Sequence, residues 1–197
     1  MQFNPATIVF LLPSLITLVV LRIRRTPWGK TLAVLGWRLG KPIHYLWALL
    51  FCLLAAIITI PVALFLLPDF YRDPTPGATT YYYAHLGLSV LSVLSAFLNE
   101  FFFTALGEEA FFRGLLGGWL MRRFGFLVGN TLQTLIFLLP HLPVLLVAAS
   151  FWPLLAFPLL LGWVNGWLRY KSDSIFPGML IHAVGNTVND VLAMVMF

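Results

Sequence analysis

Residues 44–67 read HYLWALLFCLLAAIITIPVALFLL, a stretch without a single Asp, Glu, Lys or Arg, and this stretch decides the class of fold. About 20 apolar residues in a helix cross the roughly 30 Å hydrocarbon core of a bilayer. Pro68 ends the run, and turn-forming residues follow it. The stretch therefore predicts a membrane-spanning helix.

The composition of the whole chain points the same way. Of 197 residues, 60% are hydrophobic and only 10% are charged, whereas soluble domains carry roughly a quarter charged residues. A water-soluble protein of this size lacks the charge to cover its surface, so we expect the lipid bilayer as its main partner. The single cysteine, Cys52, excludes an internal disulfide.

Six stretches are long and apolar enough to cross a membrane. They cover about residues 5–21, 44–67, 84–121, 127–142, 143–168 and 175–197. The third would form a straight helix about 57 Å long, which is too long for one crossing. We therefore expect a break or sharp tilt near Gly107, followed by a short helix over residues 108–123.

The net charge of +5 is concentrated in three short connections. They are residues 22–43, the pair Arg122-Arg123, and the region of Arg169 and Lys171. The positive-inside rule places all three on the cytoplasmic side, so the charge indicates topology and not a nucleic-acid partner. Residues 68–83 read as an external loop, and six crossings put both termini outside. We expect an all-α helical bundle in the cell (inner) membrane, a single domain over residues 1–197 with its polar motifs within about 84–197.

Ionisable side chains inside a membrane cost several kcal/mol unless they are paired or hydrated, so each one is a candidate functional residue. In the predicted spans these are Glu100, Glu108, Glu109, Arg113, His141, His182 and Asp190.

The densest group is GEEAFFRG at residues 107–114. On a helix Glu109 and Arg113 face each other at i and i+4, so they can neutralise each other. Glu108 is rotated by about 100° from Glu109 and is left without that partner. An unpaired carboxylate in low dielectric is a candidate general base or acid. A purely structural ion pair next to the cytoplasmic interface is the alternative.

A second polar group lies on the last span. His182 and Asn186 are four residues apart, and Asn189 continues the same helical face. Buried polar groups need partners, so we expect this stripe to face the polar residues of the third span. Packing between helices is the alternative explanation for Asn186. His141 follows Pro140 at the end of a span, where an interfacial role is the alternative to a catalytic one.

Three short motifs together resemble one family. EEAFFRG at residues 108–114, FLLPH at 137–141 and HAVGN at 182–186 match the EExxxR, FxxxH and HxxxN motifs of the CPBP family, which includes CAAX prenyl proteases and bacteriocin-processing or self-immunity proteins. Their order along the chain also matches. The resemblance covers roughly residues 100–190.

The resemblance implies an intramembrane glutamate-type endopeptidase that cleaves a membrane-tethered or prenylated peptide near the cytoplasmic face. Glu108 would be the general base, with His141 helping to place the water. His182 and Asn186 would stabilise the oxyanion, and Glu109 and Arg113 would orient the site. Peptide hydrolysis does need a base and donors directed at the developing charge.

Other mechanisms and functions stay open from the sequence. One glutamate and two histidines could hold a catalytic zinc, but no HExxH motif is present, and we favour a mechanism without a cofactor. No serine accompanies the histidines, and Cys52 lies in another region. The non-enzymatic alternatives are a self-immunity or peptide-binding protein and a proton- or cation-coupled transporter.

Overall fold

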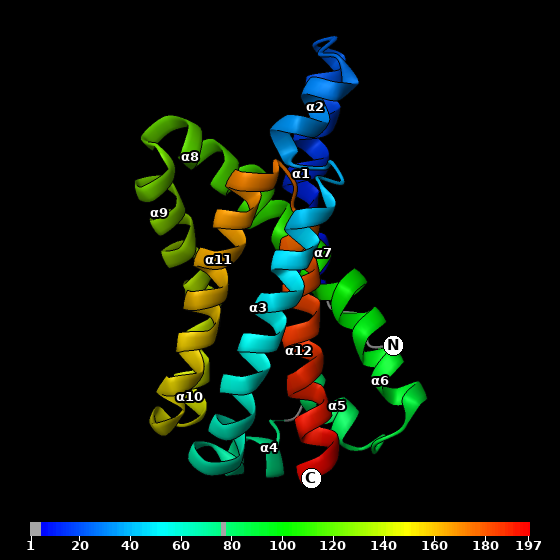
Figure 1. Ribbon diagram of the computed structural model, residues 1–197, viewed down its shortest axis with the longest axis vertical. Helices are drawn as coiled ribbons and strands as arrows, with labels where there is room; N and C mark the ends of the chain where they lie inside the picture. The colour runs from blue at the N-terminus through cyan, green and yellow to red at the C-terminus, as the bar shows by residue number, and fades with distance from the viewer. Residues whose placement is uncertain (1–4, 76–77) are drawn as a thin grey trace.

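The computed structural model describes residues 5–75 and 78–197, and over these residues it is helical and contains no strand (Figure 1). Six helical stretches are long and apolar enough to cross a membrane. They are Pro5–Ile23, Pro42–Leu66, Val90–Phe124, Phe126–Val147, Ala149–Ser172 and Phe176–Met196. The six predicted spans are therefore confirmed, and we describe the chain as a multi-pass membrane protein.

The first two spans are α1 (Pro5–Ile23) and α3 (Pro42–Pro61), the second extended by a π-helical turn over Val62–Leu66. A short helix, α2 (Trp28–Leu35), lies between them. Large apolar side chains on α1 and α3 stay exposed, among them Val9, Leu53 and Ile57, as expected for surfaces that face lipid.

The predicted external loop, residues 68–83, contains two short helices, α4 (Pro68–Arg72) and α5 (Thr79–Ala84). Residues 76 and 77 of that loop lie outside the described residues. Both helices pack against the last span, which explains why Tyr71 and Tyr83 are fully buried although their segments are short. Burial raises the pKa of Tyr71 to about 12.

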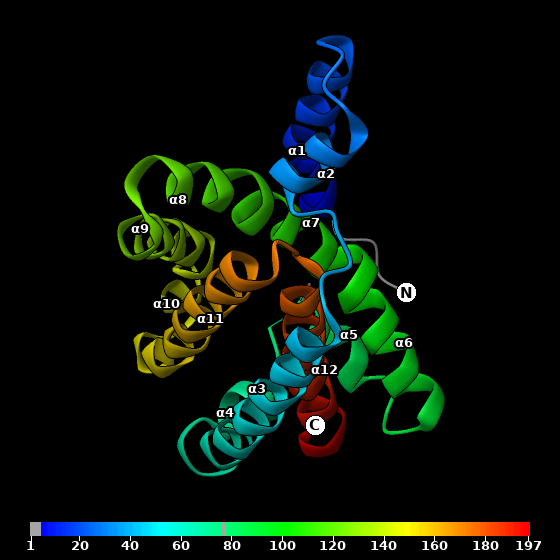
Figure 2. The same ribbon diagram turned by 45° about the horizontal axis from the view of Figure 1, so that its top comes forward.

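The third span is helical from end to end, but its helix type changes. It begins as α6 (Val90–Glu100), where the Ser89 hydroxyl accepts a hydrogen bond from the Ser92 amide, and it continues through α7 (Leu106–Glu108) to α8 (Gly118–Phe124). Two π-helical segments, Phe101–Ala105 and Glu109–Gly117, lie on either side of α7. Figure 2 shows α8 turned away from the line of α6. The expected change of direction near Gly107 is thus a tilt achieved without breaking the helix, as π-helical turns allow.

The remaining spans surround the end of the chain. The helix α9 (Phe126–Leu138) is followed by a 3₁₀ turn, Leu139–His141, and by α10 (Val144–Val147). A 3₁₀ segment, Ala149–Leu155, leads into α11 (Ala156–Ser172), and α12 (Phe176–Met196) completes the bundle. Because α12 packs against α3, α5, α6 and α11, its polar residues face other helices (Figure 2).

The three basic connections lie at one end of the bundle, the upper end in Figure 1. They join α1 to α3, α8 to α9, and α11 to α12. This shared position is what the sequence predicts for loops on one side of a membrane.

The turn between α8 and α9 depends on two glycines. Gly125 has a φ of 79°, a conformation that favours glycine. One turn into α9, a Cβ on Gly129 would lie 2.5 Å from the Met121 backbone nitrogen. The two helices therefore approach each other too closely for any side chain at Gly129.

We expect Gly129→Ala to lower the free energy of unfolding by about 1–3 kcal/mol, because the added methyl group overlaps a backbone that cannot move locally. Gly185→Ala is the matched control, since it changes a helical glycine with no atom within 4 Å of the new Cβ. Thermal unfolding in detergent compares the two variants. Equal melting temperatures would contradict the close approach of α8 and α9.

Candidate functional site

Side chains from four helical regions meet in the middle of the bundle. Glu108, Glu109 and Arg113 come from the third span, and Asn165 comes from α11. His182 and Asn186 come from α12, while His141 lies in the turn after α9. These include all the residues that the sequence predicts for the site.

Glu109 is the most highly connected of these residues. One oxygen, Oε1, lies 3.0 Å from Arg113 Nη1, accepts a hydrogen bond from Asn165 Nδ2 at 3.0 Å and lies 3.0 Å from His182 Nδ1. Glu109 and Arg113 are both fully buried. The expected ion pair at i and i+4 is therefore confirmed, and it also connects three helices.

Arg113 also contacts an aromatic ring. Its guanidinium carbon lies 3.9 Å from the centre of the Phe137 ring, a cation–π contact. Phe137 also lies beside the rings of His141 and His182, so one aromatic side chain packs against the arginine and both histidines.

Glu108 has a different environment from its neighbour. Its Oε2 lies 3.7 Å from His182 Nε2 and has no hydrogen-bond partner among the described residues. The side chain is 15% exposed, whereas that of Glu109 is 0% exposed. The His182 imidazole thus lies between two carboxylates: Glu109, whose Oε1 has three partners, and Glu108, whose Oε2 has none among the described residues and is free to accept a proton.

The hydrogen-bond partners of His141 and His182 indicate which ring nitrogen of each histidine carries a proton. A carboxylate can only accept, so His182 Nδ1–H donates to Glu109. A backbone carbonyl also only accepts, so His141 Nδ1–H donates to the Phe137 oxygen at 2.9 Å. In both rings Nε2 is left for other partners, which for His182 is the side nearest Glu108.

A cavity of about 200 Å³ lies against this group. Its polar lining consists of His141, His182, Asn186 and Asn189. The rest is apolar and is supplied mainly by α11 and the segments around it, namely Phe70, Phe137, Val144, Leu154, Leu155, Phe157, Pro158 and Leu161. A small number of polar groups at one wall of an apolar cavity is the usual composition of a ligand site.

Of the three polar residues on one face of α12, His182 and Asn186 have the partners that the sequence predicts, and Asn189 does not. His182 and Asn186 face the third span, as predicted, and Asn186 Nδ2 donates to Glu100 Oε2 at 2.7 Å. Asn189 instead accepts a hydrogen bond from the Tyr71 hydroxyl on α4, at 2.9 Å. Glu100, for which the sequence suggests no role, therefore fixes the amide that lines the cavity.

Sequence reasoning missed Asn165. Its amide donates both to Glu109 and to the Gly178 carbonyl, so it ties α11 to the third and last spans. The available signal was an amide side chain inside an apolar run, LLLGWVNGW, where a polar group has to find a partner. The same signal marks Asn130 and Gln133, which are buried and bond the backbone of α11.

The zinc alternative can be compared with this geometry. Over residues 5–75 and 78–197, no three His, Cys, Asp or Glu side chains are grouped so that they could hold a metal ion. Glu108, His141 and His182 are therefore not arranged as the ligand set considered from the sequence.

A comparison with protein families matches residues 89–188 to the family described as Type II CAAX prenyl endopeptidase Rce1-like. This stretch is half of the chain and contains all three motifs. The protein belongs to this family of CAAX-type membrane proteases, whose substrates are proteins. Neither the comparison with curated proteins nor that with solved structures gave a match.

We expect Arg113→Met to lower the free energy of unfolding by about 3–5 kcal/mol, because it leaves the Glu109 carboxylate buried without its cation. The double variant with Glu109→Gln should recover part of this loss, since the remaining amide carries no charge. Thermal unfolding of the two variants in detergent measures both effects. A single variant as stable as the wild type would show that the ion pair does not hold the three helices.

Proposed function

We propose that the protein is an intramembrane endopeptidase in which Glu108 activates a water molecule for attack on a peptide bond. The observation that carries this proposal is the Glu108 carboxylate, with a free oxygen 3.7 Å from a histidine that Glu109 holds in place. Membership of the CAAX prenyl endopeptidase family supports the reaction class.

In the proposed reaction Glu108 takes a proton from the water, and the oxygen attacks the carbonyl carbon of the scissile bond. His141 Nε2, which its backbone contact leaves free, accepts a hydrogen bond from the same water and helps to place it. The tetrahedral intermediate collapses when Glu108 returns the proton to the leaving amine. No covalent bond to the enzyme forms at any step.

The developing oxyanion would receive hydrogen bonds from Asn186 and His182. Glu100 accepts from one amide hydrogen of Asn186, and the second hydrogen is available to the substrate. His182 would use Nε2–H, which requires the imidazolium form because Nδ1–H is directed at Glu109. Donors that are fixed before the reaction lower its barrier most effectively.

The substrate is proposed to be a membrane-tethered or prenylated peptide. The apolar lining of the cavity suits aliphatic side chains next to the scissile bond. The positive-inside rule predicts that the basic end of the bundle lies in the cytoplasm and both termini outside. Because His182 lies about 10 Å along α12 from that end, cleavage would occur near the cytoplasmic face.

Glu108→Gln should lower the rate of peptide hydrolysis by about 10²- to 10⁴-fold, because the amide cannot accept the proton of the water. The assay uses quenched prenylated and unprenylated peptides with the purified protein, with and without a chelator. Asp73→Asn is the control, since it removes one negative charge from an exposed side chain that lines neither cavity.

Equal turnover by wild type and Glu108→Gln would exclude Glu108 as the base. Activity lost with chelator and restored by zinc would overturn the mechanism without a metal. Peptide binding without hydrolysis by the wild type would favour a self-immunity or peptide-binding role.

Asn186→Ala should lower kcat by about 10²-fold and leave KM nearly unchanged, because the lost hydrogen bond forms mainly in the transition state. Thr187→Val is the matched control on the same helix, since among the described residues the Thr187 hydroxyl bonds only the Ala183 carbonyl one turn away. A rise in KM at constant kcat would instead make Asn186 a substrate-binding residue.

A further inference from the structure

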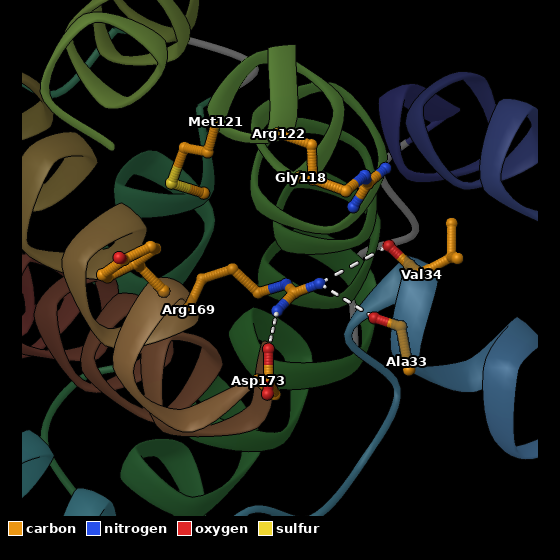
Figure 3. Close-up of a pocket in the computed structure, with 8 residues that line it drawn as sticks. Ala33, Val34, Gly118, Met121, Arg122, Arg169 and Asp173 are labelled. Carbon is orange, nitrogen blue, oxygen red and sulfur yellow. Dashed lines mark hydrogen bonds and ion pairs between the residues drawn. The ribbon is translucent and has the colours of Figure 1, made fainter. Parts of the chain in front are cut away.

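A second cavity, of about 330 Å³, lies at the basic end of the bundle (Figure 3). Residues from α2, α8, α11 and the turn after α11 form it, namely Ala33, Val34, Gly118, Met121, Arg122, Arg169, Tyr170 and Asp173. None of these residues lines the cavity of the proposed active site.

Arg169 forms the inner wall of this cavity and is only 5% exposed. Its Nη2 donates to the carbonyls of Ala33 and Val34 at the end of α2, at 3.1 and 3.4 Å. Its Nη1 lies 3.5 Å from Asp173, whose side chain is 75% exposed and so offsets little of the buried charge.

Arg122 brings a second guanidinium to the same place. Its Nη1 lies 3.1 Å, and Arg169 Nη2 lies 3.7 Å, from the point that a Cβ on Gly118 would occupy. Figure 3 shows the Arg169 guanidinium directed at the carbonyls of Ala33 and Val34, with Arg122 beside Gly118. Arg122 has no hydrogen-bond or ion-pair acceptor within residues 5–75 and 78–197. Two like charges this close repel each other unless an anion lies between them.

The chain segments around the cavity contain too few acidic side chains to supply that anion. The three basic connections contain ten of the twelve Lys and Arg residues, but Asp173 is their one acidic residue. Any anion that neutralises the two arginines has to come from outside the described part of the chain.

We propose that this cavity binds the phosphate group of an anionic phospholipid. Guanidinium groups match phosphate oxygens with paired N–H donors. The cavity lies near the ends of two candidate spans, Val90–Phe124 and Ala149–Ser172, where lipid headgroups are expected. Trp119 and Tyr170 are 54% and 52% exposed on the two helices that border it. Aromatic side chains at this level are typical of the membrane interface. A substrate carboxylate is the less favoured ligand, since the cavity shares no residue with the active-site cavity.

The test measures binding of short-chain phosphatidylglycerol to the purified protein in a neutral detergent, by calorimetry or native mass spectrometry. Short-chain phosphatidylcholine and inorganic phosphate are the comparison ligands. Phosphatidylcholine tests whether binding requires the net negative charge of the lipid, and inorganic phosphate tests whether the phosphate alone is sufficient. We expect phosphatidylglycerol to bind most tightly and Arg122→Gln to weaken it about tenfold, the loss of one charge-assisted hydrogen bond.

Arg123→Gln is the matched control, since it removes the neighbouring positive charge from a residue that does not line the cavity. A second variant, Gly118→Leu, keeps both arginines and fills the space between them, and it should also abolish the preference for phosphatidylglycerol.

Three outcomes would overturn the proposal. Equal weakening by Arg122→Gln and Arg123→Gln would show attraction to the general surface charge. Inorganic phosphate binding as tightly as the lipid would point to a soluble anion. Unchanged lipid binding by Arg122→Gln together with a raised KM for peptide would assign the cavity to the substrate.

Discussion

The carboxylate of Glu109 holds together helices that are far apart in the sequence. One of its oxygens meets a guanidinium from its own helix, an amide from α11 and an imidazole from α12. An unpaired charge in such a buried position would cost several kcal/mol, so each partner has to stay within hydrogen-bond distance. The position of His182, and with it the geometry around Glu108, depends on this contact.

Two adjacent glutamates therefore have separate roles in the proposed enzyme. Successive residues of a helix point about 100° apart, so Glu109 enters the ion-pair network while Glu108 reaches only the far side of the same imidazole. The paired residue supplies rigidity, and the free one supplies a proton acceptor. Two polar residues of α12 also have separate partners: His182 contacts the Glu109 network, and Asn186 is oriented by Glu100.

The charged groups of the bundle are separated along its length. Glu108, Glu109, His141 and His182 lie in the site within the spans, whereas ten of the twelve arginines and lysines lie at one end. Arg169 lies between these regions: it is four residues from Asn165, which bonds Glu109, and its guanidinium reaches the carbonyls of α2. An occupied cavity at Arg169 would thus stabilise the helix that supports the proposed active site.

The sequence alone determined the features that depend on local geometry. The six spans follow from the length of apolar runs, the Glu109–Arg113 pair follows from helical spacing, and the facing of His182 and Asn186 toward the third span follows from their shared helical face. The three motifs identified the family. The bond from Asn165 to Glu109, the contact of Glu100 with Asn186 and the meeting of Arg122 with Arg169 were decided only by the tertiary structure. Each joins segments whose relative rotation and depth are set by packing between helices, and the π-helical turns that rotate the third span leave no pattern in its apolar sequence.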